Sequence, residues 1–103
     1  MYAPQGYRLV FEDRFAGPEL DLEKWEYRGT GRGACGFYAP SEVSIRDGRL
    51  VLSGRYREDG QFGPGWYAGH VRVKQRFTRG YFETRCICSE ALPQNTLWSA
   101  FWL

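Results

Sequence analysis

The sequence predicts an all-β, antiparallel fold, and three observations support this prediction. Aromatic residues make up 17% of the 103 residues, and thirteen glycines accompany them, a mixture that favours short strands and turns over long helices. Two β-rich runs flank Asp47-Gly48, a dipeptide well suited to a tight hairpin turn. Between Gly69 and Phe77, apolar and polar residues alternate, which is the pattern of a strand with one buried face.

The N-terminal third predicts one strand, one turn and one connection. Tyr7 to Phe11 (YRLVF) reads as the first strand. Residues 20–25 (LDLEKW) predict a single helical turn with Asp21 as its N-cap, because a short carboxylate accepts the free N–H groups there. The glycine-rich run 28–36 is interpreted as a flexible connection, since no helix pattern follows its glycines.

The central hairpin has a defined pair of faces. Val43 and Ile45 share one face of its first run, and Leu50 and Leu52 share one face of the second. Residues 58–65 (EDGQFGPG) read as a loop. The strand that follows has one apolar face and one basic face. The apolar face carries Val71, Val73 and Phe77. The basic face carries His70, Arg72, Lys74 and Arg76. We interpret the basic face as solvated, and His70 there has no evident partner for a role as a general base.

Two further predicted strands bring together residues suited to sugar binding. In the run 81–88 (YFETRCIC), Glu83 and Arg85 share one face, and in the run 97–103 (LWSAFWL), Trp98 and Trp102 share one face. Two indoles separated by a small residue form a flat floor on which the C–H face of a pyranose can pack. A carboxylate acceptor and a forked guanidinium donor beside that floor suit sugar hydroxyls. The alternative, in which both tryptophans complete a sandwich core, remains open from this segment alone.

Composition excludes several classes of function. The net charge is +2, from 14 basic and 12 acidic residues, which is too balanced to indicate a nucleic-acid or membrane-surface protein. No apolar run is long enough to span a bilayer. Three cysteines without C-x-x-C spacing and a single histidine argue against a zinc site. The first residues lack a secretory signal pattern, although a mature start would look the same, so secretion stays open.

Four segments, in order, resemble the N-terminal half of a glycoside hydrolase family 16 domain, the group that includes laminarinases, lichenases and agarases. They are YRLVFEDRF with LDLEKW downstream, VSIRDGRLVL, AGHVRVKQRFTRGYFETR and LWSAFWL. The resemblance implies a concanavalin-like jelly-roll sandwich with a sugar cleft, a polysaccharide substrate and a secreted or extracellular protein. It also implies that Glu83, Arg85, Trp98 and Trp102 line the cleft.

The same resemblance implies that residues 1–103 are the N-terminal portion of one domain, truncated before the catalytic strand. In the family, the next strand carries a Glu-x-Asp-x-x-Glu or Glu-x-Asp-x-Glu motif, which supplies nucleophile and acid/base. That motif is absent from these 103 residues, so we expect no catalytic residue here and an inactive fragment without its C-terminal half. No cofactor is expected beyond a structural calcium, for which Gly48 matches a backbone ligand, although Arg14 replaces the usual glutamate and makes calcium doubtful.

Three classes of function are candidates for this sequence. The first is a retaining endo-β-glycosidase acting on β-1,3-glucan or a related β-glucan or galactan. Ser99, in place of a proline common in laminarinases, leaves β-1,3-glucan and algal galactan both open. The second is a non-catalytic, lectin-like β-glucan-binding module, which the residues of the following strand would distinguish from the first. The third is an RNA-binding sheet prompted by RGYFETRC, which fails because Phe82 and Glu83 do not fit the required pattern.

Overall fold

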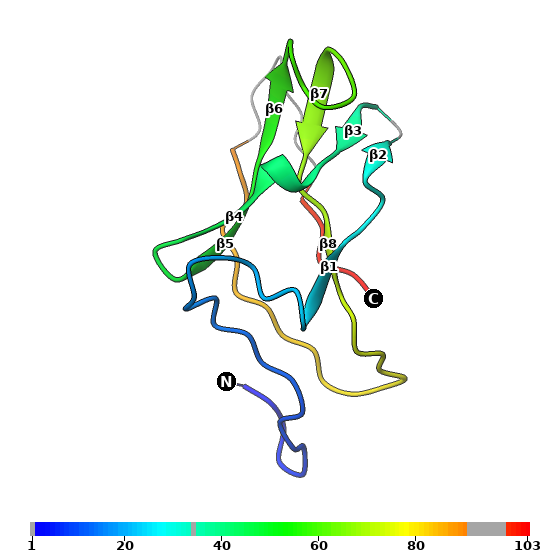
Figure 1. Ribbon diagram of the computed structural model, residues 1–103. Helices are drawn as coiled ribbons and strands as arrows, with labels where there is room; N and C mark the ends of the chain where they lie inside the picture. Colours follow the sequence, from blue (N-terminus) through cyan, green and yellow to red (C-terminus); the bar gives the residue numbers. More distant parts are fainter. Residues whose placement is uncertain (1, 34, 91–98) are drawn as a thin grey trace. The chain divides into compact units, whose positions relative to one another are not determined.

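The computed structural model describes residues 2–33, 35–90 and 99–103, and within them the chain is built almost entirely of strands and loops (Figure 1). It divides into two units, residues 10–76 and residues 1–9 with 77–103. The secondary structure elements all belong to residues 10–76. They are β1 (Trp25–Tyr27), β2 (Gly31–Arg32), β3 (Phe37–Tyr38), the 3₁₀ turn η1 (Pro40–Glu42), β4 (Val43–Arg46), β5 (Arg49–Leu52), β6 (Gly54–Arg57), β7 (Gly65–Ala68) and β8 (Val71–Val73).

Within the part of the chain that the structure describes, the strands form three small sheets. Their orders are β1-β8, β2-β3-β7-β6 and β4-β5. Every pair is antiparallel except β3 with β7, which run parallel. The all-β class is therefore confirmed, and the mainly antiparallel pairing is consistent with a jelly-roll-like fold. No helix in the described part of the chain is long and apolar enough to cross a membrane.

The β4–β5 hairpin confirms the prediction from Asp47-Gly48 (Figure 1). Both turn residues have positive φ, 52° for Asp47 and 69° for Gly48, as a type I′ turn requires. The register pairs Val43 with Leu52 and Ile45 with Leu50. The four apolar residues therefore face one another across the hairpin.

Among the described residues, the best-buried aromatic side chain is that of Tyr67 of β7, which is 1% exposed. Its ring lies 5.0 Å from the ring of Phe37 on the parallel neighbour β3. The phenol donates a hydrogen bond to the Gly63 carbonyl at 2.7 Å and accepts one from Phe62 N–H at 2.8 Å. The loop from β6 to β7 thus closes over the ring, and it comes so close at Gly60 that no Cβ fits there.

The helical turn predicted after Leu20 is confirmed. Asp21 Oδ1 accepts the N–H of Glu23 at 3.0 Å, and the Asp21 carbonyl accepts the N–H groups of Lys24 and Trp25. The turn delivers Trp25 into β1, where the indole Nε1 donates to Asp13 Oδ2 at 2.8 Å. Asp21 therefore caps the start of the turn, and the turn positions the Trp25 indole to reach Asp13.

Several predicted strands are corrected by the structure. Residues 7–11, 81–88 and 99–103 join no ladder, and residues 97–98 lie outside the described residues. The predicted strand 69–77 is shortened to β8, which is as long as its partner β1. The connection predicted at 28–36 contains β2, which pairs with β3. Alternation gives a strand only where a neighbouring backbone supplies hydrogen bonds, and sequence alone did not locate those neighbours.

We predict that Gly60→Ala destabilises the protein more than Gly17→Ala. The new methyl group at position 60 would overlap the Tyr67 ring, whereas at position 17 its nearest neighbour is the Glu19 carbonyl at 3.7 Å. Overpacking of this kind costs on the order of 1–3 kcal/mol in the free energy of unfolding, and the control should change it by less than about 0.5 kcal/mol. Urea denaturation measures both, and equal midpoints would contradict this packing.

Candidate functional site

The residues predicted for sugar binding belong to the unit formed by residues 1–9 and 77–103. Glu83 Oε2 accepts hydrogen bonds from Tyr2 N–H at 3.1 Å and from the Tyr81 hydroxyl at 3.0 Å. The hydrogen bond to the Glu83 carboxylate raises the pKa of the Tyr81 phenol. Tyr81 also packs edge-on against Tyr7, with ring centroids 6.2 Å apart. The structure therefore gives Glu83 a local anchor.

The other members of the predicted cleft are exposed or outside the described residues. Arg85 is exposed, Trp102 is 63% exposed, and Trp98 falls in the segment that is not described. Because the strands whose parity motivated the grouping are not formed here, the structure adds no support for a shared face. The convergence of Glu83, Arg85, Trp98 and Trp102 stays a prediction.

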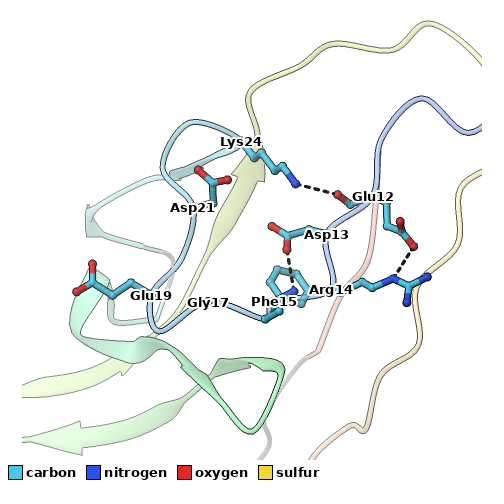
Figure 2. A pocket seen from close by; sticks show the side chains of 9 residues that line it. Glu12, Asp13, Arg14, Phe15, Gly17, Glu19, Asp21 and Lys24 are labelled. Atoms are coloured by element: carbon cyan, nitrogen blue, oxygen red, sulfur yellow. Dashed lines mark hydrogen bonds and ion pairs between the residues drawn. The ribbon is translucent and has the colours of Figure 1, made fainter.

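A hollow of about 400 Å³ lies in the N-terminal part of residues 10–76 (Figure 2). It is lined by charged and small residues, namely Glu12, Asp13, Arg14, Phe15, Ala16, Gly17, Glu19, Asp21 and Lys24. Figure 2 shows the Arg14 guanidinium paired with the Glu12 carboxylate, at 3.0 Å, and the Lys24 ammonium donating to the Glu12 carbonyl, at 3.1 Å. The lining of the hollow therefore includes two positively charged side chains, those of Arg14 and Lys24.

This hollow does not fit a calcium ion. Arg14 and Lys24 would repel a divalent cation, and Asp13 is committed to Phe15 N–H and to the Trp25 indole. Among the residues that the structure describes, no group of three acidic, histidine or cysteine side chains is arranged to hold a metal. Gly48 lies at the hairpin tip with φ 69°. Calcium at Gly48 therefore stays a prediction from the sequence alone.

The sequence analysis missed a buried carboxylate, that of Glu42. The side chain is fully buried, and its two oxygens hold two arginines of β6. Arg57 donates from Nε to Oε2 at 2.8 Å and from Nη2 to Oε1 at 3.4 Å, while Arg55 Nε lies 2.8 Å from Oε1. The Ser41 hydroxyl donates to Oε2 as well. The available signal was the pair of arginines two residues apart in GRYR, which share one strand face.

Opposing forces set the protonation of Glu42. Burial by itself raises the pKa of the carboxyl, because it disfavours the charged form. The hydrogen bonds from Arg57 and Ser41 and the charges of Arg57 and Arg55 outweigh burial, so the pKa of Glu42 is lowered overall. The carboxylate is therefore ionised at neutral pH and serves as a fixed counter-ion.

His70 is not on an exposed face, and that expectation is wrong. The residue is half-buried, and its ring centroid lies 4.8 Å from that of Tyr38. Nδ1 is buried and has no hydrogen-bond partner among the described residues. Burial, together with the charges of Arg28 and Arg72, lowers the pKa of His70. A neutral imidazole packed against tyrosine is a structural side chain.

The basic stripe of the same strand is solvated, as the sequence predicts. Arg72 and Glu26 are register partners of β8 and β1, and Arg72 Nη2 lies 2.8 Å from Glu26 Oε1. Both side chains are more than one third exposed, so the pair contributes little to stability.

Comparison with known proteins shows a similarity to a curated protein. It is named Beta-porphyranase D and comes from Zobellia galactanivorans. The two sequences are 33% identical over 112 residues, which cover 92% of this chain and 26% of the relative. This chain is similar to a β-porphyranase. It spans about a quarter of that protein's length. No protein-family model matches the chain, and no solved structure matches it.

We predict that the contribution of Glu42 to stability is lost at acid pH. Because its pKa is lower in the folded state than in the unfolded chain, the stabilisation is fully present above the ordinary pKa of about 4.3 and disappears as the pH falls through the folded value. Glu42→Gln should lower the free energy of unfolding at neutral pH by on the order of 2 kcal/mol and flatten its acid dependence. Denaturant titrations at several pH values measure this. Glu26→Gln, in an exposed pair, is the control, and equal losses in both variants would contradict the assignment.

We also predict that the imidazole titrates below the ordinary histidine pKa of about 6.5. The sequence has a single histidine, so its ring proton signals can be followed by NMR without overlap. With the folded pKa depressed, stability is complete above pH 6.5 and falls as the pH drops below it. His70→Phe should remove this part of the pH dependence. A midpoint at or above 6.5 would argue against the buried, unpartnered Nδ1.

Proposed function

We propose that this chain is the N-terminal portion of a glycoside hydrolase family 16 domain whose complete form hydrolyses a polysaccharide. The observation that carries the proposal is the similarity to β-porphyranase D across 92% of the chain. The ordered family segments and the all-β structure with its Asp47-Gly48 hairpin support it. Family resemblance also makes secretion part of the proposal.

The proposed reaction is that of a retaining endo-β-glycosidase. Such an enzyme needs two carboxyl groups about 5 Å apart, one as nucleophile and one as acid/base. The family places both on a strand that the 103 residues do not include. This chain would supply part of the cleft, in which Glu83 accepts hydrogen bonds from sugar hydroxyls, Arg85 donates them, and Trp98 and Trp102 stack on the ring. Residues that bind ground state and transition state equally do not accelerate the reaction.

The relative's name makes porphyran the first substrate to test, ahead of the β-1,3-glucans. A lectin-like module that keeps the cleft and lacks the carboxylates is the alternative. Both functions share the binding residues of this chain and differ in the strand that follows them in the family. An assay that measures both glycan binding and glycan turnover therefore distinguishes the two functions.

We predict that a protein extended through the following strand hydrolyses porphyran, laminarin or agarose, while the 103-residue chain alone does not. Reducing-end release measures turnover. In the extended protein, Trp102→Ala should weaken glycan binding by on the order of 1–3 kcal/mol, by analogy with base stacking on aromatic side chains.

The matched control for that variant is Trp66→Ala. Trp66 is also exposed, but it lies on β7, away from the predicted cleft residues in sequence. Turnover by the isolated chain would overturn the assignment of catalysis to the absent motif. Glycan binding without turnover by the extended protein would establish the lectin-like alternative. If the extended protein shows neither glycan binding nor turnover, both functions are rejected.

A further inference from the structure

Two arginines of β6 share one carboxylate, which leaves the cluster with a net positive charge. Glu42 carries one negative charge, and Arg55 and Arg57 carry two positive charges against it. Within residues 2–33, 35–90 and 99–103, neither guanidinium forms a salt bridge to a second acidic side chain. One positive charge is therefore not neutralised locally.

Part of each arginine side chain stays exposed to solvent. Arg55 and Arg57 are two residues apart on β6 and share one strand face, paired in the register with Tyr67 and Gly65 of β7. Both use Nε to reach Glu42. Arg55 remains 52% exposed and Arg57 32% exposed, while the carboxylate beneath them is fully buried. The two side chains are thus held by one buried anchor and stay partly exposed to solvent.

The two arginines differ from an ordinary surface pair in their partner. The Glu42 carboxylate is fully buried and Arg57 is only 32% exposed, so water screens this cluster less than it screens a pair of exposed side chains, although Arg55 itself is exposed. An external anion would complete the cluster without reorganisation, since the side-chain entropy of both arginines is already reduced by the contact with Glu42. A guanidinium fork matches the planar carboxylate or the oxygens of a sulfate ester better than an ammonium does.

We propose that Arg55 and Arg57, anchored by Glu42, bind the anionic substituent of an acidic polysaccharide. The identity of the ligand as a polysaccharide rests on the proposed function. The substituent is a sulfate ester or a carboxylate, which share the chemistry that two guanidiniums recognise. The site differs from the predicted cleft of Glu83, Arg85, Trp98 and Trp102, and it also differs from the basic stripe, in which Arg72 is paired with Glu26.

The experiment measures glycan binding to the 103-residue chain by calorimetry at low salt. The probes are κ-carrageenan oligosaccharides, the same oligosaccharides after chemical desulfation, and oligogalacturonate. The expected result is a dissociation constant about tenfold lower for a charged glycan than for the desulfated one. Arg55→Gln, which leaves the Arg57–Glu42 pair in place, should abolish that difference.

Arg72→Gln is the matched control, because it removes the same charge from an exposed strand position. It should change binding less than twofold. Arg55→Lys keeps the charge without the fork and should retain part of the preference. Thermal unfolding of each variant verifies that the fold is retained. If affinity exceeds that for the desulfated glycan only with carrageenan, the site binds sulfate. If it does so only with oligogalacturonate, the site binds carboxylate.

Two outcomes would overturn the proposal. Equal losses in Arg55→Gln and Arg72→Gln would indicate diffuse electrostatics rather than a site. Equal affinity for charged and desulfated glycans would show that the two arginines do not contact the anionic group, even if the chain binds glycans. Failure of the proposed function gives a different signature, namely no turnover or binding of neutral glycans by the extended protein.

Discussion

The carboxylate of Glu42 and the backbone around it connect η1 with β6 and with the segments that follow β5 and β7. Its N–H bonds to Ala39, and its carbonyl accepts the N–H of Ser53, which lies between β5 and β6. The same carbonyl lies so close to Gly69 that no side chain fits at that position. With the side chain bound to β6, one residue contacts the connections before β4, after β5 and after β7. A buried charge is stable there only because every part of it is compensated.

Charge in this structure falls into two regimes. Pairs on the surface, such as Arg72 with Glu26 and Arg14 with Glu12, lie in water and contribute little. The Glu42 side chain is fully buried, and the effective dielectric constant is lower there than in water. Each charge interaction of Glu42 is therefore stronger than that of an exposed pair. A near-neutral sequence can therefore present a local excess of positive charge, since the excess depends on which groups are buried together and not on the total.

The parts of the fold that depend on local chemistry could be predicted from the sequence. The hairpin at Asp47-Gly48 follows from two residues that tolerate positive φ, and the turn at Asp21 follows from one capping carboxylate. The length of β8 could not be predicted, because it is set by its partner β1, which is distant in the sequence. The burial of Glu42 is also a tertiary effect, since it requires η1 to meet β6. For the candidate site, residue types at Glu83 and Trp102 indicated sugar chemistry, but strand parity could not place them without the neighbouring backbone.

The pairings also differ in how far along the chain they reach. The β4–β5 hairpin closes over two residues, and β6 and β7 are joined by one loop, whereas Glu26 meets Arg72 across a separation of 46 residues. Hairpins form in microseconds, and contacts between distant segments wait for the loop-closure entropy to be repaid. We therefore expect the two hairpins to form before the chain brings β1 to β8, so that the sheet β1-β8 forms late in the folding of this unit.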